Sequence, residues 1–383
     1  MKLSFSLDKH LFVNFLSLVQ SICGKRTAID STANILFKVD SENEIILRAT
    51  DLEVSFQFAI PAKIHSHEIT SFCVNAKRLH DFVRDLDGEL LFEFDGSTLS
   101  INYGDGESWD KDFYLKLSTS DHMLFPIFPE NIENIIDLDT VSLQTCIDKI
   151  YQLSNAQTSI IAGFLFDFDQ EGFNIAVTNG HTLSLAKTSA YALTEPQSWV
   201  LSKKAVGELK KLIDFLNTPG AGFSNQIFLG TCKGQLVFSG NGFNFFSKLV
   251  NESFPNYKPI IASLESFSKG RISLKSLLPS LKRVGYLLNG KFLPATFDFS
   301  NNKVKISFVN NDSGSFSEAI SFDNLCNLNY SFKFFTPYLL SACSAFEEKD
   351  VEFLIKESNS SPIVLSFENE GTTFVHLVMP VVS

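Results

Sequence analysis

The chain has 383 residues, 44% of them hydrophobic and 20% charged, which is enough apolar material for two or three packed domains. Its formal net charge of −11, taken alone, argues against a nucleic-acid partner, because phosphate binding depends on Lys and Arg. No apolar run reaches the roughly 18 residues of a membrane span, and charges interrupt the start, MKLSFSLDKHLF, where a signal peptide needs an apolar core. A soluble, cytoplasmic protein is therefore expected.

Four kinds of segment follow one another along the chain, three times over. Apolar residues at i, i+3 or i+4 and i+7 predict a first helix beginning at Leu7, Leu138 and Ser273. Each is followed by a strand with a small polar turn, in IILRATDLEV from Ile45, FNIAVTNGHTL from Phe173 and VKISFVNNDSG from Val304. A second helix is predicted from Val74, Leu201 and Phe332, and each set closes with two or three strands joined by hairpin turns.

These segments recur at a nearly constant interval. Thr50, Thr178 and Val309 hold equivalent places, 128 and then 131 residues apart. Proline-bearing stretches at 123–133 and 253–261 mark the boundaries. We therefore predict an α+β fold of three tandem αβ units with antiparallel sheets, in domains 1–128, 129–257 and 258–383. Three such units in tandem form a curved row. If the curvature is suitable, the row can close into a ring through head-to-tail contact with a second copy.

Positive charge is concentrated on the predicted helices. Their windows (7–27, 74–86, 138–153, 201–216, 269–287 and 332–346) hold 17 basic and 7 acidic residues, a net +10, which leaves −21 elsewhere. Basic pairs at i and i+7 share a helix face, as do Lys77 with Arg84 and Lys203 with Lys210. Solvated helix faces are the common explanation of such charge. The alternative is a polyanion held at one surface through its phosphates, without reading of sequence.

Catalytic and metal-binding signals are weak. The six cysteines stand singly, so they predict no zinc ribbon or redox motif and are expected to be reduced and buried. The histidines have no metal-ligand spacing, and Gly104–Gly106 and Gly240–Gly242 are typical of hairpin turns rather than phosphate loops. The Thr178–Leu183 turn could hold a catalytic His181, but a structural turn or binding surface is favoured. No catalytic residue, metal or cofactor is predicted.

Several short motifs, in order, resemble the bacterial sliding clamp family, the beta subunit of DNA polymerase III, over essentially the whole chain. They are Ala49-Thr50-Asp51-Leu52-Glu53, Thr178-Asn179-Gly180-His181, Ser247-Lys248-Leu249-Val250 with Phe254-Pro255-Asn256-Tyr257, and the ending Val378-Met379-Pro380. The resemblance implies a non-catalytic processivity factor: a homodimeric ring of six domains, helices inside and sheets outside, around duplex DNA. A protein scaffold with this fold but no DNA role is the alternative, and an enzyme using the Thr178–Leu183 turn is a more remote one.

The resemblance also implies three sets of functional residues. The DNA-facing set is Arg26, Lys77, Arg78, Lys203 and Lys204, to which the charge pattern adds Lys282 and Arg283. A pocket for short linear peptides of the replicative polymerase, the clamp loader, repair polymerases and mismatch-repair proteins would use Ile161, Thr178, Gly180, His181, Leu183, Pro255, Ile260, Tyr338, Ser361, Val378, Met379 and Pro380. The ring contact would join Phe113 and Leu115 of one chain to Tyr286 and Leu287 of the other.

The sequence departs from the family pattern around this pocket. Thr182 stands where the family commonly has Arg, and Asn179 where Asp is usual. Phe335 replaces a common Asn, Pro259 replaces an Arg, and the chain ends Val381-Val382-Ser383. Because these changes make the pocket less charged and more apolar, a shifted peptide preference is expected.

Overall fold

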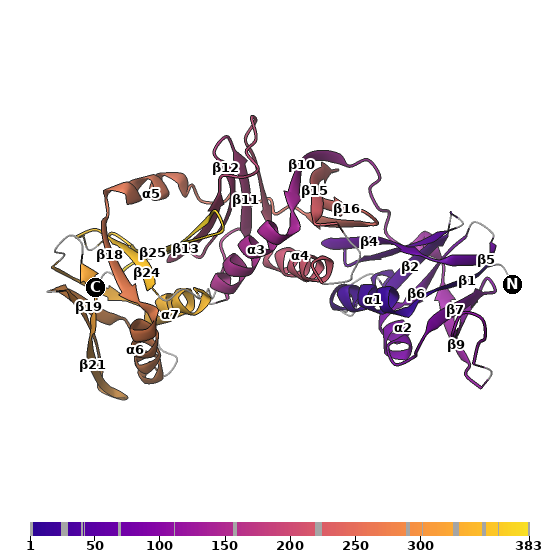
Figure 1. Cartoon of the computed structure of the whole chain (residues 1–383), viewed down its shortest axis with the longest axis horizontal. Helices are drawn as coiled ribbons and strands as arrows, with labels where there is room; N and C mark the ends of the chain where they lie inside the picture. The colour runs from indigo at the N-terminus through magenta and orange to yellow at the C-terminus, as the bar shows by residue number, and fades with distance from the viewer. Residues whose placement is uncertain are drawn as a thin grey trace. The chain divides into compact units, whose positions relative to one another are not determined.

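The computed structural model describes residues 3–23, 30–39, 41, 43–67, 70–110, 112–155, 159–218, 224–288, 292–300, 302–324, 329–346, 350–358 and 360–381 (Figure 1). Two compact units make up the chain. Unit 1 comprises Met1–Gln144 and Gly207–Leu249, and unit 2 comprises Thr145–Val206 and Val250–Ser383. The middle repeat of the sequence is thus shared between the two units.

The described helices are α1 (Lys9–Cys23), α2 (Ala76–Val83), α3 (Thr140–Ser154), α4 (Lys203–Leu216), α5 (Lys258–Ser263), α6 (Leu274–Leu287) and α7 (Thr336–Ala345). Three short 3-10 helices join them, η1 (Asp30–Ala33), η2 (His122–Leu124) and η3 (Leu264–Ser266). In Figure 1, α1 and α2 lie side by side in unit 1, and α6 and α7 lie together in unit 2. Each such pair consists of the first and second predicted helix of one repeat.

Unit 1 is built on one antiparallel sheet. Its strands are β1 (Leu3–Asp8), β2 (Asn34–Val39), β3 (Glu44–Thr50), β4 (Val54–Pro61), β5 (Lys63–His67), β6 (Thr70–Asn75), β7 (Glu89–Phe94), β8 (Thr98–Gly104), β9 (Leu115–Ser120), β10 (Glu133–Asp139), β15 (Gln226–Cys232), β16 (Gln235–Gly240) and β17 (Phe243–Lys248). The 13 strands run in the order β10-β15-β16-β17-β4-β3-β2-β6-β9-β8-β7-β1-β5. Because β17 pairs with β4, the sheet continues from the first repeat into the middle one.

Unit 2 contains two antiparallel sheets. Its strands are β11 (Phe164–Asp169), β12 (Gly172–Thr178), β13 (Thr182–Thr188), β14 (Gln197–Leu201), β18 (Ser268–Ser273), β19 (Ala295–Ser300), β20 (Lys303–Asn310), β21 (Gly314–Ser321), β22 (Asp323–Asn324), β23 (Tyr330–Phe334), β24 (Asp350–Ile355), β25 (Ile363–Asn369) and β26 (Thr372–Val378). The orders are β14-β11-β12-β13-β26-β25-β24-β18-β22 and β21-β20-β19-β23. Here β13 pairs with β26, so the middle and last repeats share a sheet.

Phenylalanine dominates the core, as its alternation along the predicted strands indicates. Phe92, Phe166 and Phe245 are each fully buried, and the Phe56 and Phe245 rings meet across the β4–β17 pair with centroids 5.0 Å apart. Aromatic side chains suit a pleated, half-buried surface and contribute large buried areas. The predicted α+β fold of repeated αβ units is confirmed.

Some predicted boundaries were wrong, and they change the charge count. Lys269 and Arg271 lie on strand β18, and Lys333 lies on strand β23, although all three were counted in helical windows. The windows were too long because α6 and α7 each begin directly or almost directly after a strand, so the apolar periodicity of the helix merges with the alternation of that strand. Helix α5 was not predicted, since six residues with Pro259 at the start are too short for a periodic signal.

The cysteine prediction agrees with the structure where it can be compared. Cys23, Cys73, Cys146, Cys232 and Cys343 are free and buried, whereas Cys326 lies outside the described residues. Burial raises the pKa of the Cys23 thiol to about 12, which keeps it protonated and unreactive.

Candidate functional site

The Thr178–Leu183 segment is a tight turn between β12 and β13. The Asn179 side-chain oxygen accepts hydrogen bonds from the backbone N–H of His181 (2.9 Å) and Thr182 (2.8 Å). The Thr178 hydroxyl donates to the Thr182 carbonyl at 2.7 Å and accepts from the Gly180 N–H at 3.1 Å. Gly180 has φ +84°, a left-handed conformation that glycine adopts without strain. The hydrogen bonds of this turn therefore fix His181 at its exposed tip.

The C-terminal tail crosses this turn. The backbone N–H of Met379 donates to the His181 carbonyl at 2.8 Å, extending the β13–β26 ladder by one residue. Two residues later, the Val381 N–H donates to the Lys333 carbonyl at 2.8 Å. The tail is thus fixed at both ends, with Pro380 between, and it joins the β12–β13 turn to the end of β23.

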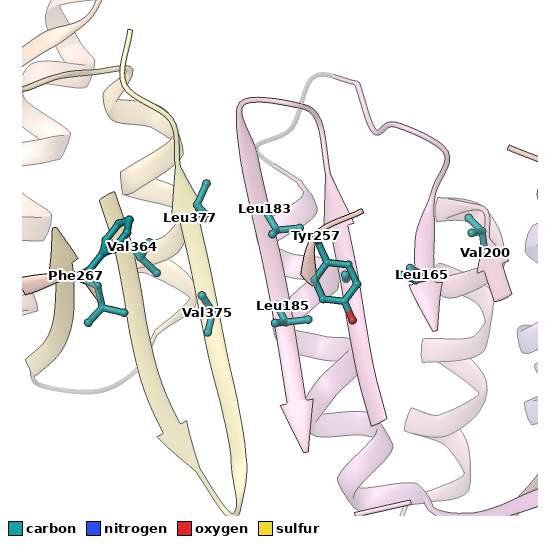
Figure 2. Close-up of a cluster of buried hydrophobic side chains, with 11 residues drawn as sticks. Leu165, Leu183, Leu185, Val200, Tyr257, Phe267, Val364, Val375 and Leu377 are labelled. Atoms are coloured by element: carbon teal, nitrogen blue, oxygen red, sulfur yellow. The ribbon is translucent and has the colours of Figure 1, made fainter. Parts of the chain in front are cut away.

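An apolar cluster lies beneath the turn and the tail. Figure 2 shows Leu183 and Leu377 on the neighbouring strands β13 and β26, with Tyr257 beside Leu183. Met379 packs against this cluster. Leu183 belongs to this cluster and is only 4% exposed, so it forms the floor rather than the accessible surface. Val378 is fully buried and is not part of the cluster.

Exposed apolar groups stand above this floor. Ile161 is 41% exposed, and its backbone N–H donates to the Thr178 carbonyl at 2.8 Å. A Cβ placed on Gly180 would lie 3.4 Å from the Cδ1 of Ile161, so the two residues are adjacent. Together with His181 and the half-buried Met379 and Pro380, they form one surface of mixed apolar and polar character. Such a surface suits a peptide with apolar anchors and a few oriented hydrogen bonds.

The segment 254–261 is attached to the same cluster by a buried polar contact. The Tyr257 hydroxyl donates to Asp167 Oδ2 at 2.8 Å, and Lys258 Nζ lies 3.0 Å from Asp167 and 2.8 Å from Asp169. Burial, and then the Asp167 hydrogen bond, raise the pKa of Tyr257, so it remains a donor. The hydrogen bond to Asp169 raises the pKa of Lys258, which stays charged.

This anchoring leaves two predicted peptide contacts on the outside. Phe254 and Ile261 pack against the cluster, whereas Pro255 and Ile260 are exposed, Ile260 by 43%. The structure therefore positions Pro255 and Ile260 through Tyr257 and its neighbours. Ser361 is half-buried before β25, and its backbone N–H donates to the Ser358 carbonyl at 3.2 Å.

Four aromatic rings lie next to one another beside the β12–β13 turn. His181 and Tyr338 are near parallel at 6.4 Å between centroids, and Tyr338 meets Phe335 edge-on at 5.1 Å. Phe335 stacks on Phe292 at 4.2 Å, and Phe292 lies 6.4 Å from His181. The Asn179 amide donates to the Tyr338 hydroxyl at 3.5 Å. Sequence reasoning missed Phe292; the available signal was an aromatic residue two positions after a glycine, outside any alternating pattern.

The predicted DNA-binding residues differ in how they are held. Lys77 and Arg78 are exposed on α2, without an ion pair to another described residue. Lys203 is half-buried at the start of α4, with Nζ 3.3 Å from the Ser154 carbonyl and 5.6 Å from the Tyr151 ring centroid. Burial lowers the pKa of Lys203.

The remaining basic candidates lie on α4 and α6. Lys204 is half-buried on α4, and Lys282 is exposed on α6. Arg283 on α6 is bound to Glu318 at 2.5 Å, and the hydrogen bonds from Ser280 and then Arg283 lower the pKa of Glu318, which keeps the pair charged. Arg283 is therefore a weaker candidate for a phosphate contact than Lys282. Arg26 lies outside the described residues.

The residues predicted to join two chains into a closed dimer also differ in their exposure. Leu115 begins β9 and is only 8% exposed, and the Phe113 ring packs edge-on against Tyr103 at 5.1 Å. On α6, by contrast, Tyr286 is 78% exposed and Leu287 is half-buried. Beside Tyr286 is a groove of about 410 Å³ lined by Lys282, Gly285, Tyr286, Leu288, Phe335, Pro337 and Leu340.

Within the described ranges no group of three His, Cys, Asp or Glu side chains is arranged to hold a metal ion. Among the same residues, no helix is long and apolar enough to cross a membrane.

Comparisons with known proteins agree with this geometry. Three family models match in order: the DNA polymerase III beta subunit N-terminal domain at residues 3–126, its central domain at 137–256 and its C-terminal domain at 265–382. A beta sliding clamp of Proteus mirabilis is 26% identical over 99% of both chains, and one of Vibrio cholerae is 23% identical over 99% of this chain and all of the relative.

Solved structures share the fold over the whole chain. The DNA polymerase III subunit beta of Pseudomonas aeruginosa aligns with a TM-score of 0.84 at 21% identity, covering 99% of each chain. The Bacillus subtilis sliding clamp aligns with a TM-score of 0.83 at 18% identity, covering both chains fully. Sliding clamps are non-catalytic processivity factors, which agrees with the prediction that the chain is not an enzyme. The chain belongs to the DNA polymerase III beta subunit family, the bacterial sliding clamps.

Proposed function

We propose that two copies of this chain close into a ring around duplex DNA in the cytoplasm and tether the replicative polymerase, the clamp loader and repair proteins. The observation that carries the proposal is the uninterrupted series of three clamp-domain matches, N-terminal, central and C-terminal, over nearly the whole chain. The proposed domains are 1–128, 129–257 and 258–383. No step of this function requires a cofactor or a catalytic residue.

The proposed contact with DNA is to phosphate alone. Lys77, Arg78 and Lys282 support it, since they are exposed on helices in a chain of net charge −11. Lys203 and Lys204 would add positive charge at the start of α4, and Arg26 and Arg283 complete the proposed set. Weak phosphate contacts permit sliding, because the ring itself, rather than affinity, keeps the protein on DNA.

Ring closure is proposed through Phe113 and Leu115 of one chain and Tyr286 and Leu287 of the other. Residues 115–118 of β9 pair with β8, and the β6 ladder reaches only Thr119 and Ser120, so part of β9 offers one edge to a partner strand. Tyr286, exposed beside an apolar groove, supports the other half of the contact.

Small-angle scattering combined with light scattering tests the ring. A mass of twice 42.8 kDa, with a hollow, flat shape, is expected for the purified protein. Tyr286→Asp should give monomers, and because the side chain is exposed the protomer itself should remain folded. A dimer that persists in Tyr286→Asp at low concentration would contradict this interface, and a compact wild-type monomer would contradict the ring.

Partner docking is proposed at the surface formed by Ile161, the Thr178–Leu183 turn, Pro255, Ile260, Tyr338, Ser361 and Val378–Pro380. A labelled peptide with a QLxLF-type core should bind in fluorescence anisotropy with micromolar affinity. Met379→Ala should weaken that binding, because Met379 covers the apolar cluster beneath the site. Phe82→Ala, which removes a half-exposed ring from α2, is the matched control and should leave binding unchanged.

A further inference from the structure

The aromatic pair formed by Phe292 and Phe335 is more exposed to solvent than a pair in a packed core. Phe292 is 53% exposed, yet its ring is stacked on that of Phe335 with centroids 4.2 Å apart and an interplanar angle of 29°. A large exposed aromatic held in one orientation by a second ring presents a flat apolar face to solvent. Such pre-organised faces are typical of recognition surfaces, since little side-chain entropy is lost on binding.

This pair is continuous with the proposed peptide surface. Phe292 lies 6.4 Å from His181, and Phe335 meets Tyr338 edge-on at 5.1 Å. The tail connects the two regions, because Met379 is hydrogen-bonded to His181 and Val381 is hydrogen-bonded to Lys333, two residues before Phe335. A peptide lying along His181 and the tail therefore reaches the aromatic pair within one or two residues.

The occupant of the pair is limited by its chemistry. Phe292 and Phe335 offer only aromatic faces and edges, the Asn179 amide and the Tyr338 hydroxyl are hydrogen-bonded to each other, and the His181 ring lies 6.4 Å from Phe292. An aromatic side chain of the bound peptide would stack there, whereas a charged or amide side chain would lose hydration without a compensating hydrogen bond.

We propose that the stacked rings of Phe292 and Phe335 give the peptide site of this chain a preference for partner peptides that carry an additional aromatic residue next to their aliphatic and aromatic core. This inference rests on the proposed peptide-docking function and names the class of partner that the site prefers. One bound aromatic ring should increase affinity roughly threefold to tenfold over a small polar residue.

The test uses labelled peptides that share one QLSLF core and carry either Trp or Ser immediately before or after it. Anisotropy titrations of the full-length protein should give tighter binding for one of the Trp peptides. Phe292→Ala and Phe335→Ser should each remove that gain, so that the affinities of the Trp and Ser peptides become equal. Phe335 precedes α7 as its N-cap without a side-chain cap bond, so Ser at this position supplies a capping hydroxyl and folding should be retained.

The outcomes separate this inference from the function on which it rests. If the Ser and Trp peptides bind equally, and Met379→Ala weakens both, peptide docking stands and the aromatic extension is wrong. If no peptide binds, or Met379→Ala has no effect, peptide docking at this surface fails and the extension fails with it. A change of oligomeric mass in Phe292→Ala would identify the pair as a subunit contact and would also overturn the proposal.

Discussion

Lowering the pH from about 7.5 to about 5 should destabilise unit 2 through a single buried imidazole. His376 lies on β26, is 1% exposed, and has its Nδ1 atom 2.9 Å from the Ser184 hydroxyl on the paired strand β13. Burial lowers the pKa of His376 from 6.5 to about 4, so the folded protein holds this side chain neutral. The position matters for function because β26 leads directly into the Met379 tail.

Whether stability rises or falls with pH depends on which state, folded or unfolded, binds the proton at the higher pH. The folded pKa lies below the unfolded one, so between these values the unfolded chain takes up a proton that the folded chain excludes. The stability is fully present above about pH 6.5 and is lost as the pH falls towards 4. The whole gap corresponds to about 3 kcal/mol, of which about 2 kcal/mol is lost by pH 5.

Urea unfolding at the two pH values measures this effect. Trp199 on β14 is buried in the sheet that contains His376, and Trp109→Phe removes the other tryptophan, so fluorescence then reports on unit 2. In His376→Gln the new side chain cannot titrate but can still hydrogen-bond to Ser184. Between pH 7.5 and pH 5 this variant should lose about 2 kcal/mol less stability than the protein with His376. The carboxylates are common to both proteins and contribute equally to the loss of stability at low pH. Equal total losses would therefore refute the assignment of the effect to His376.

Three further variants test other parts of the reasoning. Tyr257→Phe removes the 2.8 Å bond to Asp167 and should cost unit 2 about 1–2 kcal/mol in urea unfolding, with weaker peptide binding; unchanged stability would contradict the anchoring role. Charge reversal of Lys77 and Arg78 should reduce the salt dependence of duplex DNA binding by roughly two units of slope, and an unaltered slope would exclude α2 from the DNA surface. Leu52 has φ +75°, so Leu52→Gly should raise the stability of unit 1 by about 1 kcal/mol in thermal unfolding, and destabilisation would show that its side chain packs usefully.

Local patterns predicted the repeated elements well. Periodicity and turn residues indicated the strand–turn segment of each repeat, and the hydrogen bonds of Thr178 and Asn179 confirm the tight turn. Features that depend on residues distant in sequence were not predictable in this way. Each of these features depends on contacts between separate segments of the chain, for which one sequence contains no signal. They are the stacking of Phe292 on Phe335, the ion pair of Arg283 with Glu318 and the burial of Leu115.

A comparison of two turns gives a physical reason to propose one peptide site per chain, although the repeats are similar. In unit 1, Thr50 and Asp51 make the same hydrogen bonds as Thr178 and Asn179 in unit 2. Each turn is also met by the end of a paired strand: the Lys248 N–H donates to the Glu53 carbonyl at 2.9 Å, as the Met379 N–H donates to the His181 carbonyl at 2.8 Å.

The backbone arrangement is therefore repeated, and the side chains differ. The first turn carries Leu52, Glu53 and Lys248, whereas the second carries Gly180 and His181 next to Met379. Charged side chains at the first turn favour water, because an apolar peptide anchor placed there would have to desolvate them. At the second turn, Gly180 lets Ile161 approach and Met379 extends the apolar cluster, so the same backbone offers an anchor site. We therefore expect the proposed peptide recognition to depend on the side chains that surround the second turn rather than on the turn itself.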